Sequence, residues 1–299
     1  MLAAAEVLNF QPSALARSLR TRTTYTVGFV VPDVASPFYA AALKGAQGAL
    51  EESGYRVMLM NSGQEVSGEV TALQTLVSHR VDGLLLATTG ISAGRFEETV
   101  GRRGTPCVFF DSLLAGAGAG GVRIDNARGI DLLVDHLVEH GHRSIAIIGG
   151  SLDETSGRER LDAFHAAMHR HGLSVAPEHV RVGRWAQEVG RAATHELLDL
   201  VEPPTAVVAS SAELALGCLA ASRERGLRLP ADLALVGFDD PYFGALLEPS
   251  LTAVGYDAEE VGAVAARLLV EAMRNSEARR ELSIPVTLVP RRSCGCEAP

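Results

Sequence analysis

The sequence predicts an α/β protein of two similar lobes, each a doubly wound parallel sheet. Short apolar runs rich in valine, isoleucine and leucine alternate with amphipathic helical stretches from Thr24 to about Asp257. This alternation is typical of parallel strands that helices cover on both faces. The same order of elements occurs twice along the 299 residues, a length that suggests about two domains. Two lobes of the same construction are therefore expected.

Each half of the chain is expected to contain four strands with helices between them. In the first half the strands are Tyr25–Val31, Tyr55–Asn61, Gly83–Ala87 and Pro106–Asp111, with helices near Pro37–Ser53 and Glu65–His79. In the second half they are Ser144–Ile148, His179–Gly183, Thr205–Ala209 and Leu233–Asp239, with helices near Arg158–His171 and Gln187–Leu200. A further helix is expected before the fourth strand of each half.

Each half ends in an extended segment that reaches an acid, Asp125 in the first half and Asp257 in the second. The chain is expected to cross between the lobes at both acids. The helix Glu259–Asn275 would then pack on the first lobe, and Ile284–Val289 would add a strand to the second. This multi-crossover hinge divides the chain into an N-terminal lobe of residues 24–125 and 258–281 and a C-terminal lobe of residues 126–257 and 282–299.

Composition favours a soluble cytoplasmic protein that does not associate with a membrane. No apolar run approaches the roughly 18–20 residues of a membrane helix. Four scattered cysteines are too few for a disulfide scaffold. At the N-terminus Glu6 interrupts the apolar stretch and the arginines follow it, which is not the order of a secretory signal.

Net charge restricts where nucleic acid could bind. The formal charge of −9 argues against a body that binds nucleic acid through its general field. Residues 11–24, however, contain Arg17, Arg20 and Arg22 and no acid. Any DNA contact is therefore expected at this end of the chain.

A ligand site is expected between the lobes, because open parallel sheets bind ligands outside the carboxyl ends of their strands. The side chains at these ends are acids, a guanidinium, hydroxyls and aromatic rings: Asp33, Asp111, Asp239, Arg160, Ser36, Ser151, Ser210, Phe38, Tyr39 and Trp185. Charged groups of this kind bind hydroxyls, and an aromatic ring covers the C–H face of a sugar. A sugar or a nucleoside is the predicted class of ligand.

Each of these residues also has a purely structural interpretation. An aspartate at a strand end often caps a helix, Trp185 could simply pack at a strand–helix junction, and Arg158 and Arg160 could belong to a solvated helix face. The prediction of a site therefore depends on their convergence.

No catalytic or cofactor motif is found in the sequence. Gly116–Gly121 (GAGAGG) precedes a strand, whereas a dinucleotide loop follows one and opens a helix. The sequence contains no GxxxxGK[ST], GxSxG or HExxH motif. We therefore expect neither an enzyme nor a cofactor.

Two groups of histidines have the spacing of metal ligands. His136 and His140 stand four apart with His142 nearby, and His165, His169 and His171 repeat the pattern. No cysteine or acid close in sequence completes a tetrahedral set, and the C-terminal Cys294-Gly-Cys296 has no second pair of its own. The sequence therefore predicts no metal site, with these residues structural or incidental.

The whole chain resembles the LacI/GalR family of bacterial transcription regulators. The matching segments are AAAEVLNFQPSALARSLRT, TVGFVVPDVASPFYA, VDGLLLATT, VRIDNARG, GHRSIAIIGG, RERLDAF, AVVASS, ALVGFDD and LTAV. The resemblance implies a periplasmic-binding-protein-like fold of type I. It also implies a homodimeric repressor that binds operator DNA and responds to a small-molecule effector.

By this resemblance, residues 1–23 are the end of a DNA-binding headpiece followed by a hinge helix at Pro12–Leu19. Leu19 stands where the family has an apolar wedge, and such a wedge unstacks a base step from the minor groove. Ser13, Arg17 and Ser18 would contact the DNA beside it. The family's helix-turn-helix is expected upstream of Met1. The alternative is an ordinary amphipathic helix.

The resemblance also implies a set of effector-binding residues: Asp33, Ser36, Phe38, Asp111, Arg160, Trp185, Ser210 and Asp239. Two positions depart from the family's pattern. Ser210 stands where many relatives have asparagine, and Tyr256 where several have another polar residue. Two other classes of protein are alternatives. One is a periplasmic sugar-binding protein of a transporter, which shares the two-lobe architecture, and the other is an α/β enzyme that acts on a sugar or nucleotide.

Overall fold

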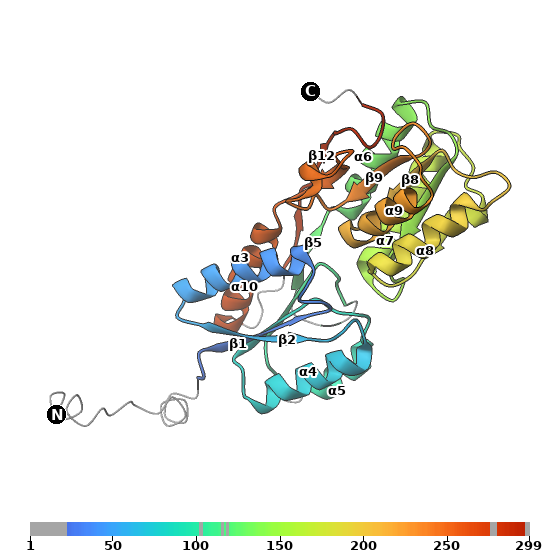
Figure 1. The fold of residues 1–299 in the computed structure, drawn as a ribbon. Coiled ribbons are helices and arrows are strands. Elements are labelled where there is room, and N and C mark those ends of the chain that lie inside the picture. The colour runs from blue at the N-terminus through green and yellow to red at the C-terminus, as the bar shows by residue number, and fades with distance from the viewer. Residues whose placement is uncertain (1–22, 102–103, 115–116, 118–119, 276–279, 297–299) are drawn as a thin grey trace, which may run out of the picture.

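The protein folds into two lobes that lie end to end (Figure 1). The computed structural model describes residues 23–101, 104–114, 117, 120–275 and 280–296. Ser13, Arg17, Ser18 and Leu19, the predicted DNA-contacting residues, lie outside these ranges. No helix in the described ranges is long and apolar enough to cross a membrane.

The first lobe is built on a six-stranded sheet in the order β11-β5-β4-β3-β1-β2. All of its neighbouring strands run parallel. The strands are β1 (Thr26–Val31), β2 (Arg56–Asn61), β3 (Gly83–Leu86), β4 (Cys107–Phe110), β5 (Gly120–Ile124) and β11 (Arg280–Ile284). Helices α3 (Pro37–Glu52) and α10 (Ala258–Arg274) cover one face, and α4 (Val66–Ser78) and α5 (Ala93–Val100) cover the other (Figure 1).

The second lobe repeats this construction with the order β12-β10-β9-β8-β6-β7. Its strands are β6 (Ile145–Gly149), β7 (Val180–Val182), β8 (Ala206–Ala209), β9 (Ala234–Phe238), β10 (Thr252–Gly255) and β12 (Thr287–Val289). Only β12 among the described strands runs antiparallel to its neighbour. The helices are α6 (Asn126–Glu139), α7 (Thr155–Arg170), α8 (Gln187–Leu198) and α9 (Ala212–Glu224), with short 3-10 turns at Pro177–His179 and Gly244–Leu246.

The two sheets have the same topology, which confirms the predicted repeat. Strands β1 to β5 are arranged 5-4-3-1-2, and β6 to β10 are arranged in the same way. Each sheet then gains one strand at the same edge, beside β5 or β10. The carboxyl ends of both sets of parallel strands therefore define equivalent edges in the two lobes.

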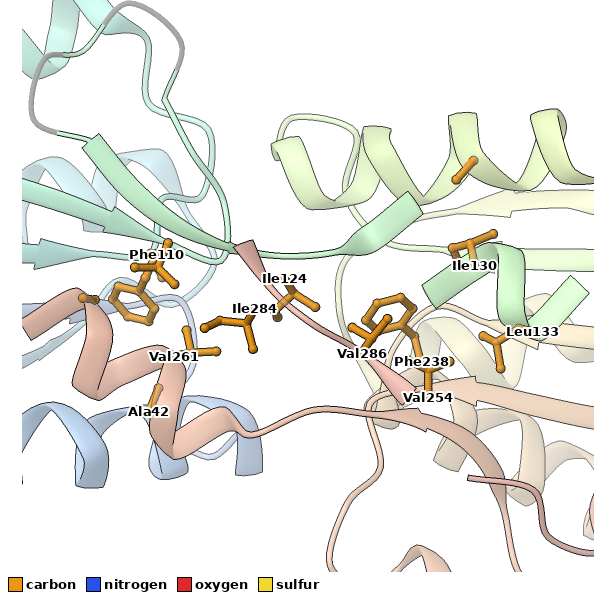
Figure 2. Close-up of a cluster of buried hydrophobic side chains, with 14 of the residues drawn as sticks. Ala42, Phe110, Ile124, Ile130, Leu133, Phe238, Val254, Val261, Ile284 and Val286 are labelled. Atoms are coloured by element: carbon orange, nitrogen blue, oxygen red, sulfur yellow. The ribbon is translucent and has the colours of Figure 1, made fainter. Parts of the chain in front are cut away.

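The chain crosses between the lobes three times: after Ile124, after Gly255 and after Ile284. The first and third crossings are joined, because the Asp125 backbone N–H donates a hydrogen bond to the Ile284 carbonyl over 3.1 Å. Buried apolar side chains continue through the crossings. Figure 2 shows Ile124, Ile284 and Val286 lying between Phe110 of the first lobe and Phe238 of the second. The hinge is therefore part of the hydrophobic core.

The two acids that end the repeated segments are helix caps. The Asp125 carboxylate accepts a hydrogen bond from the backbone N–H of Arg128 at the start of α6. In the same way Asp257 accepts one from Glu260 at the start of α10. Each cap satisfies an otherwise unpaired N–H in the first helical turn. The chain thus enters the opposite lobe through a capped helix in both cases.

The third crossing lies later in the chain than predicted. Ile284–Val289 was expected to be one strand of the second lobe, with residues 282–299 in that lobe, but β11 stays paired with β5 as far as Ile284. Pro285 then separates β11 from β12, since proline has no N–H to donate to a strand ladder. Four of the five β11 residues are exposed, so this strand has no apolar signature. We propose residues 24–125 with 258–284 and 126–257 with 286–296 as the two lobes.

Helices α3 and α10 approach closely through glycines. A Cβ added at Gly45 of α3 would overlap the carbonyl of Glu259, and one at Gly262 of α10 would overlap the carbonyl of Ala42. Only a residue without a side chain fits between helices whose backbones lie this close. The return of the chain to the first lobe therefore depends on these two positions.

Replacing Gly45 with alanine should lower the free energy of unfolding by about 1–3 kcal/mol, because backbone atoms must move apart. Gly48, on the same helix, has no atom within 4 Å of an added Cβ, so Gly48→Ala is a matched control that should be neutral or stabilise by about 0.5–1 kcal/mol. Urea denaturation of both variants measures the difference. Equal stability of the two variants would show that the close approach is unimportant.

Candidate functional site

A cavity lies between the lobes, where the strands of both sheets end. We call it the interlobe cavity. Its lining residues come from both lobes and from the second crossing: Pro32, Asp33, Ser36, Phe38, Tyr39, Gln64, Asp111, Ser156, Arg160, Trp185, Ser211, Glu213, Asp239 and Tyr256.

Seven of the eight predicted effector residues line this cavity: Asp33, Ser36, Phe38, Asp111, Arg160, Trp185 and Asp239. Ser210 is the one that does not. Its backbone N–H donates to the Ile148 carbonyl over 2.9 Å, so Ser210 continues the ladder of β8 and is fully buried. The adjacent Ser211 lines the cavity instead and caps α9. Strand β8 ends at Ala209 as predicted, but the next residue, Ser210, still bonds to β6 and does not line the cavity.

Asp111 and Asp239 occupy equivalent positions in the two lobes. Each directly follows the fourth strand of its repeat, and each has a positive φ, 64° and 68° respectively. Aspartate tolerates this left-handed conformation better than most residues. Each also accepts a hydrogen bond from a tyrosine hydroxyl, Asp111 from Tyr39 over 2.9 Å and Asp239 from Tyr256 over 2.6 Å. The repeat thus places two oriented carboxylates on opposite walls of the cavity.

Arg160 is the cation among the lining residues, and its guanidinium is fixed on several sides. Its Nε donates to Asn126 Oδ1 over 2.8 Å, and a terminal nitrogen donates to the Ser210 carbonyl. Its Cζ lies 3.7 Å from the ring centroid of Phe238 and 5.4 Å from that of Trp185. Stacking on rings and planar hydrogen bonding suit arginine in particular. Arg160 is therefore a buried, oriented group and not part of a solvated helix face.

The carboxyls around Arg160 have altered proton affinities. Burial raises the pKa of Asp111 to about 6, although Arg160 and the Tyr39 hydroxyl favour the charged form. Burial, with the nearby Asp111 carboxylate, raises the pKa of Glu154 to about 8. Burial and the neighbouring Asp239 also raise the pKa of Glu213. These groups therefore hold protons more readily than ordinary carboxyls.

The described lining residues carry more acid than base. Asp33, Asp111, Glu213 and Asp239 are acids, and Arg160 is the base. A negatively charged ligand would be repelled by the closely placed carboxylates of the lining. The cavity therefore suits a neutral or cationic molecule with hydroxyl groups better than an anion such as a phosphate ester.

Hydrogen bonds join the lobes on either side of the cavity. The Gln64 side chain donates to the Trp185 carbonyl over 3.2 Å. At another point the Thr155 backbone N–H donates to Ser112 Oγ over 2.8 Å, and its hydroxyl donates to the Leu113 carbonyl over 2.6 Å. The start of α7 is thereby attached to the end of β4 in the opposite lobe. These hydrogen bonds hold the two lobes together beside the cavity.

Ser156 Oγ lines the cavity and is buried without a hydrogen-bond partner among the described residues. An unpaired buried polar group costs about 1–3 kcal/mol. Ser156 Oγ is therefore suited to contact a polar molecule within the cavity.

Sequence reasoning did not select the lining residues Gln64 and Glu213. Glu213 lies in the first turn of α9, so a rule that included the first helical turn as well as the strand end would have selected it. Gln64 lies in the loop after β2 and has a positive φ of 59°. Nothing in its sequence context indicates that it reaches the second lobe.

The raised pKa of Glu154 predicts how stability changes with pH. A carboxyl with a folded pKa of about 8 and an ordinary pKa of 4.5 stabilises the fold below pH 4.5, and this contribution is lost as the pH rises towards 8. In Glu154→Gln the loss of unfolding free energy between pH 5.5 and pH 8 should be smaller than in the wild type. Urea denaturation at both pH values tests this.

The exposed Glu52 provides the control, because Glu52→Gln should keep the pH dependence of the wild type. An unchanged pH dependence in Glu154→Gln would contradict a raised pKa at that residue.

Comparisons with known proteins agree with the fold and indicate its family. The periplasmic binding protein-like domain family matches residues 134–294. The HTH-type transcriptional repressor PurR of Proteus mirabilis is 32% identical over 293 residues, which is 97% of this chain and 86% of that protein. The ribose operon repressor of Escherichia coli is 32% identical over 90% of this chain and 81% of its own length.

Among solved structures, a LacI family transcriptional regulator from Enterococcus faecium with bound ribose is similar to this chain. It is 26% identical with a TM-score of 0.80, and the match covers 90% of this chain and 98% of the other. These relatives are transcription regulators and not enzymes. By sequence, over nearly its whole length, and by fold, the chain belongs to the LacI family of transcription regulators.

Proposed function

We propose that the protein is an effector-responsive repressor in which a neutral polyhydroxylated molecule, a sugar or nucleoside, binds in the interlobe cavity. The observation that carries this proposal is the convergence of oriented carboxylates, a stacked guanidinium and aromatic rings from both lobes around one cavity. The carboxylates and Arg160 would bind hydroxyls in charge-assisted hydrogen bonds. Phe38 and Trp185 would cover the apolar face of the ring.

Two relatives support a sugar as the class of effector. One is named a ribose operon repressor, and one solved regulator holds ribose. The acidic lining supports the same class, since it disfavours phosphorylated ligands. The relatives are named as repressors, and this does not favour the alternative, which is the sugar-binding protein of a transporter.

Binding would control the arrangement of the lobes, because the ligand contacts both walls at once. A ligand changes a conformational equilibrium only by its difference in affinity for the two states. To move a population from 1:99 to 99:1 this difference must be about 5.5 kcal/mol. The ligand would contact Asp111 on one wall and Asp239 on the other. The distance between these two carboxylates changes when the lobes move, so the affinity depends on the lobe arrangement.

We further propose that the protein acts on operator DNA in the cytoplasm as a homodimer, as a palindromic operator requires. The segment of residues 1–23 would contact DNA through Ser13, Arg17, Ser18 and Leu19. The first lobe follows directly after this segment in the chain, so a shift of paired first lobes would change the spacing of the two DNA-contacting segments.

A thermal-shift screen with D-ribose, other pentoses and hexoses, nucleosides and their phosphate esters tests the class of ligand. A neutral member should raise the melting temperature, since a ligand at 100 times its Kd stabilises by about 2.7 kcal/mol. Its phosphate ester should bind more weakly because of the acidic lining. A phosphate ester that binds more tightly than every neutral member would contradict the proposal.

Variants of the two walls test the site itself. Asp111→Asn and Asp239→Asn keep the shape of the side chain, and each should weaken the binding of the selected ligand about tenfold or more, because a charge-assisted hydrogen bond is lost. Asp162→Asn is the control, since Asp162 is exposed on α7 and does not line the cavity. Calorimetric titration measures the affinities. Wild-type affinity in both wall variants would rule out this cavity as the site.

A further inference from the structure

His136 of α6, His140 at the C-cap of that helix and two cysteines of the C-terminal segment converge at the C-terminal end of α6. His136 Nε2 lies 3.1 Å from the Sγ atoms of both Cys294 and Cys296. His140 Nε2 lies 3.2 Å from Cys296 Sγ, and the two sulfurs are 3.1 Å apart. We call these four residues the α6–tail cluster.

The sequence predicted no metal site because neither pair of residues has further ligands close to it in the chain. The structure places the two pairs beside each other. The histidine pair and the cysteine pair each lack a partner nearby in the sequence, but they are 156–160 residues apart and adjacent in space. Strand β12 brings the tail alongside β10, and buried Ser293 then fixes it. Ser293 Oγ donates to the Leu235 carbonyl over 2.6 Å and accepts from the Thr252 N–H over 2.8 Å. The cysteines follow directly after this anchored residue.

The local backbone aims all four side chains at one point. Histidines four apart on a helix lie on the same face. His140 Nδ1 lies 2.8 Å from the His136 carbonyl, and the tautomer that donates this hydrogen bond presents an unprotonated Nε2 to the sulfur. Gly295 has a φ of +95°, a conformation that favours glycine, and it reverses the chain so that both sulfurs lie on the same side. Thr252 Oγ1 lies 3.0 Å from Cys294 Sγ and helps to fix the position of this sulfur.

We propose that the α6–tail cluster is a structural zinc site that fastens the C-terminal segment to α6. Two imidazole nitrogens and two thiolates are the ligand set of closed tetrahedral zinc sites. The ligand atoms of His136, His140 and Cys296 all lie within 4.8 Å of one another, and Cys294 Sγ is the adjacent fourth. Zinc bond lengths require nitrogen–sulfur separations of about 3.6 Å, so the histidine–sulfur contacts of 3.1–3.2 Å would open by about half an ångström. Cys294 Sγ, which is not in the group of ligand atoms within 4.8 Å of one another, would move towards His140. Each thiol would release its proton to the solvent on binding.

A disulfide between the two cysteines accounts for less of the geometry. It would join the sulfurs but would give no role to the two imidazole nitrogens directed at them. All four cysteines of the chain are free in the structure. The zinc site also differs from the interlobe cavity, because none of its four residues lines that cavity.

The metal content of the full chain, purified without a histidine tag from cells grown with zinc, tests the proposal. Mass spectrometry of the metal should find about one zinc per chain, as for a closed structural site. Removal of the zinc by a chelator should lower the melting temperature, and its return should restore it. Cobalt in place of zinc should give the visible bands of a tetrahedral ion together with thiolate-to-cobalt charge transfer.

Variants identify the ligands. His140→Gln and Cys296→Ser should each retain less than about a tenth of the zinc, whereas His169→Gln, an exposed helical histidine outside the cluster, should retain all of it. The proposal is overturned if reduced wild-type protein binds no zinc, if the double variant with both His140→Gln and Cys296→Ser keeps its zinc, or if the zinc-supplemented protein contains a Cys294–Cys296 disulfide. The cobalt spectrum of the wild type does not depend on how well any variant folds.

Discussion

One buried guanidinium connects the parts of this protein that must act together. Arg160 bonds to Asn126, the first residue of the helix that leaves the first crossing, and to the carbonyl at the end of β8. It also stacks on Phe238, the last residue of β9. A buried charge is costly unless it is paired and hydrogen-bonded. The buried Arg160 guanidinium therefore requires both these partners and the surrounding carboxylates. The hinge, the second sheet and the interlobe cavity are thereby joined at one side chain.

Around this guanidinium the duplicated topology produces a site that neither lobe contains alone. Each repeat ends its fourth strand in an aspartate with a positive φ that a tyrosine hydroxyl orients. Because Asp111 and Asp239 stand on opposite walls, a ligand that contacts both senses the distance between the lobes. The continuous core through the three crossings limits the motion to changes that keep Ile124, Ile284 and Val286 buried (Figure 2). A few discrete lobe arrangements are the expected result.

The sequence was informative where a local pattern corresponds to one structure. Buried strands such as β3 and β8 are continuous apolar runs, and the strand-end rule selected most of the cavity because parallel strands bring their carboxyl ends to one edge. It was uninformative where the structure depends on distant partners. Strand β11 is exposed and has no periodicity, Ser210 differs from Ser211 only by where β8 ends, and the α6–tail cluster joins residues more than 150 positions apart.

The central claim is that a small molecule binds between the lobes and contacts both. Hydrogen–deuterium exchange of the whole chain, with and without D-ribose or the panel member that stabilises it most, tests this claim directly. The account predicts slower exchange in the strand-end segments of both lobes, at residues 32–38 and 111–113 in the first and 184–186 and 239–241 in the second. Slower exchange confined to one lobe, or found only away from these segments, would contradict it.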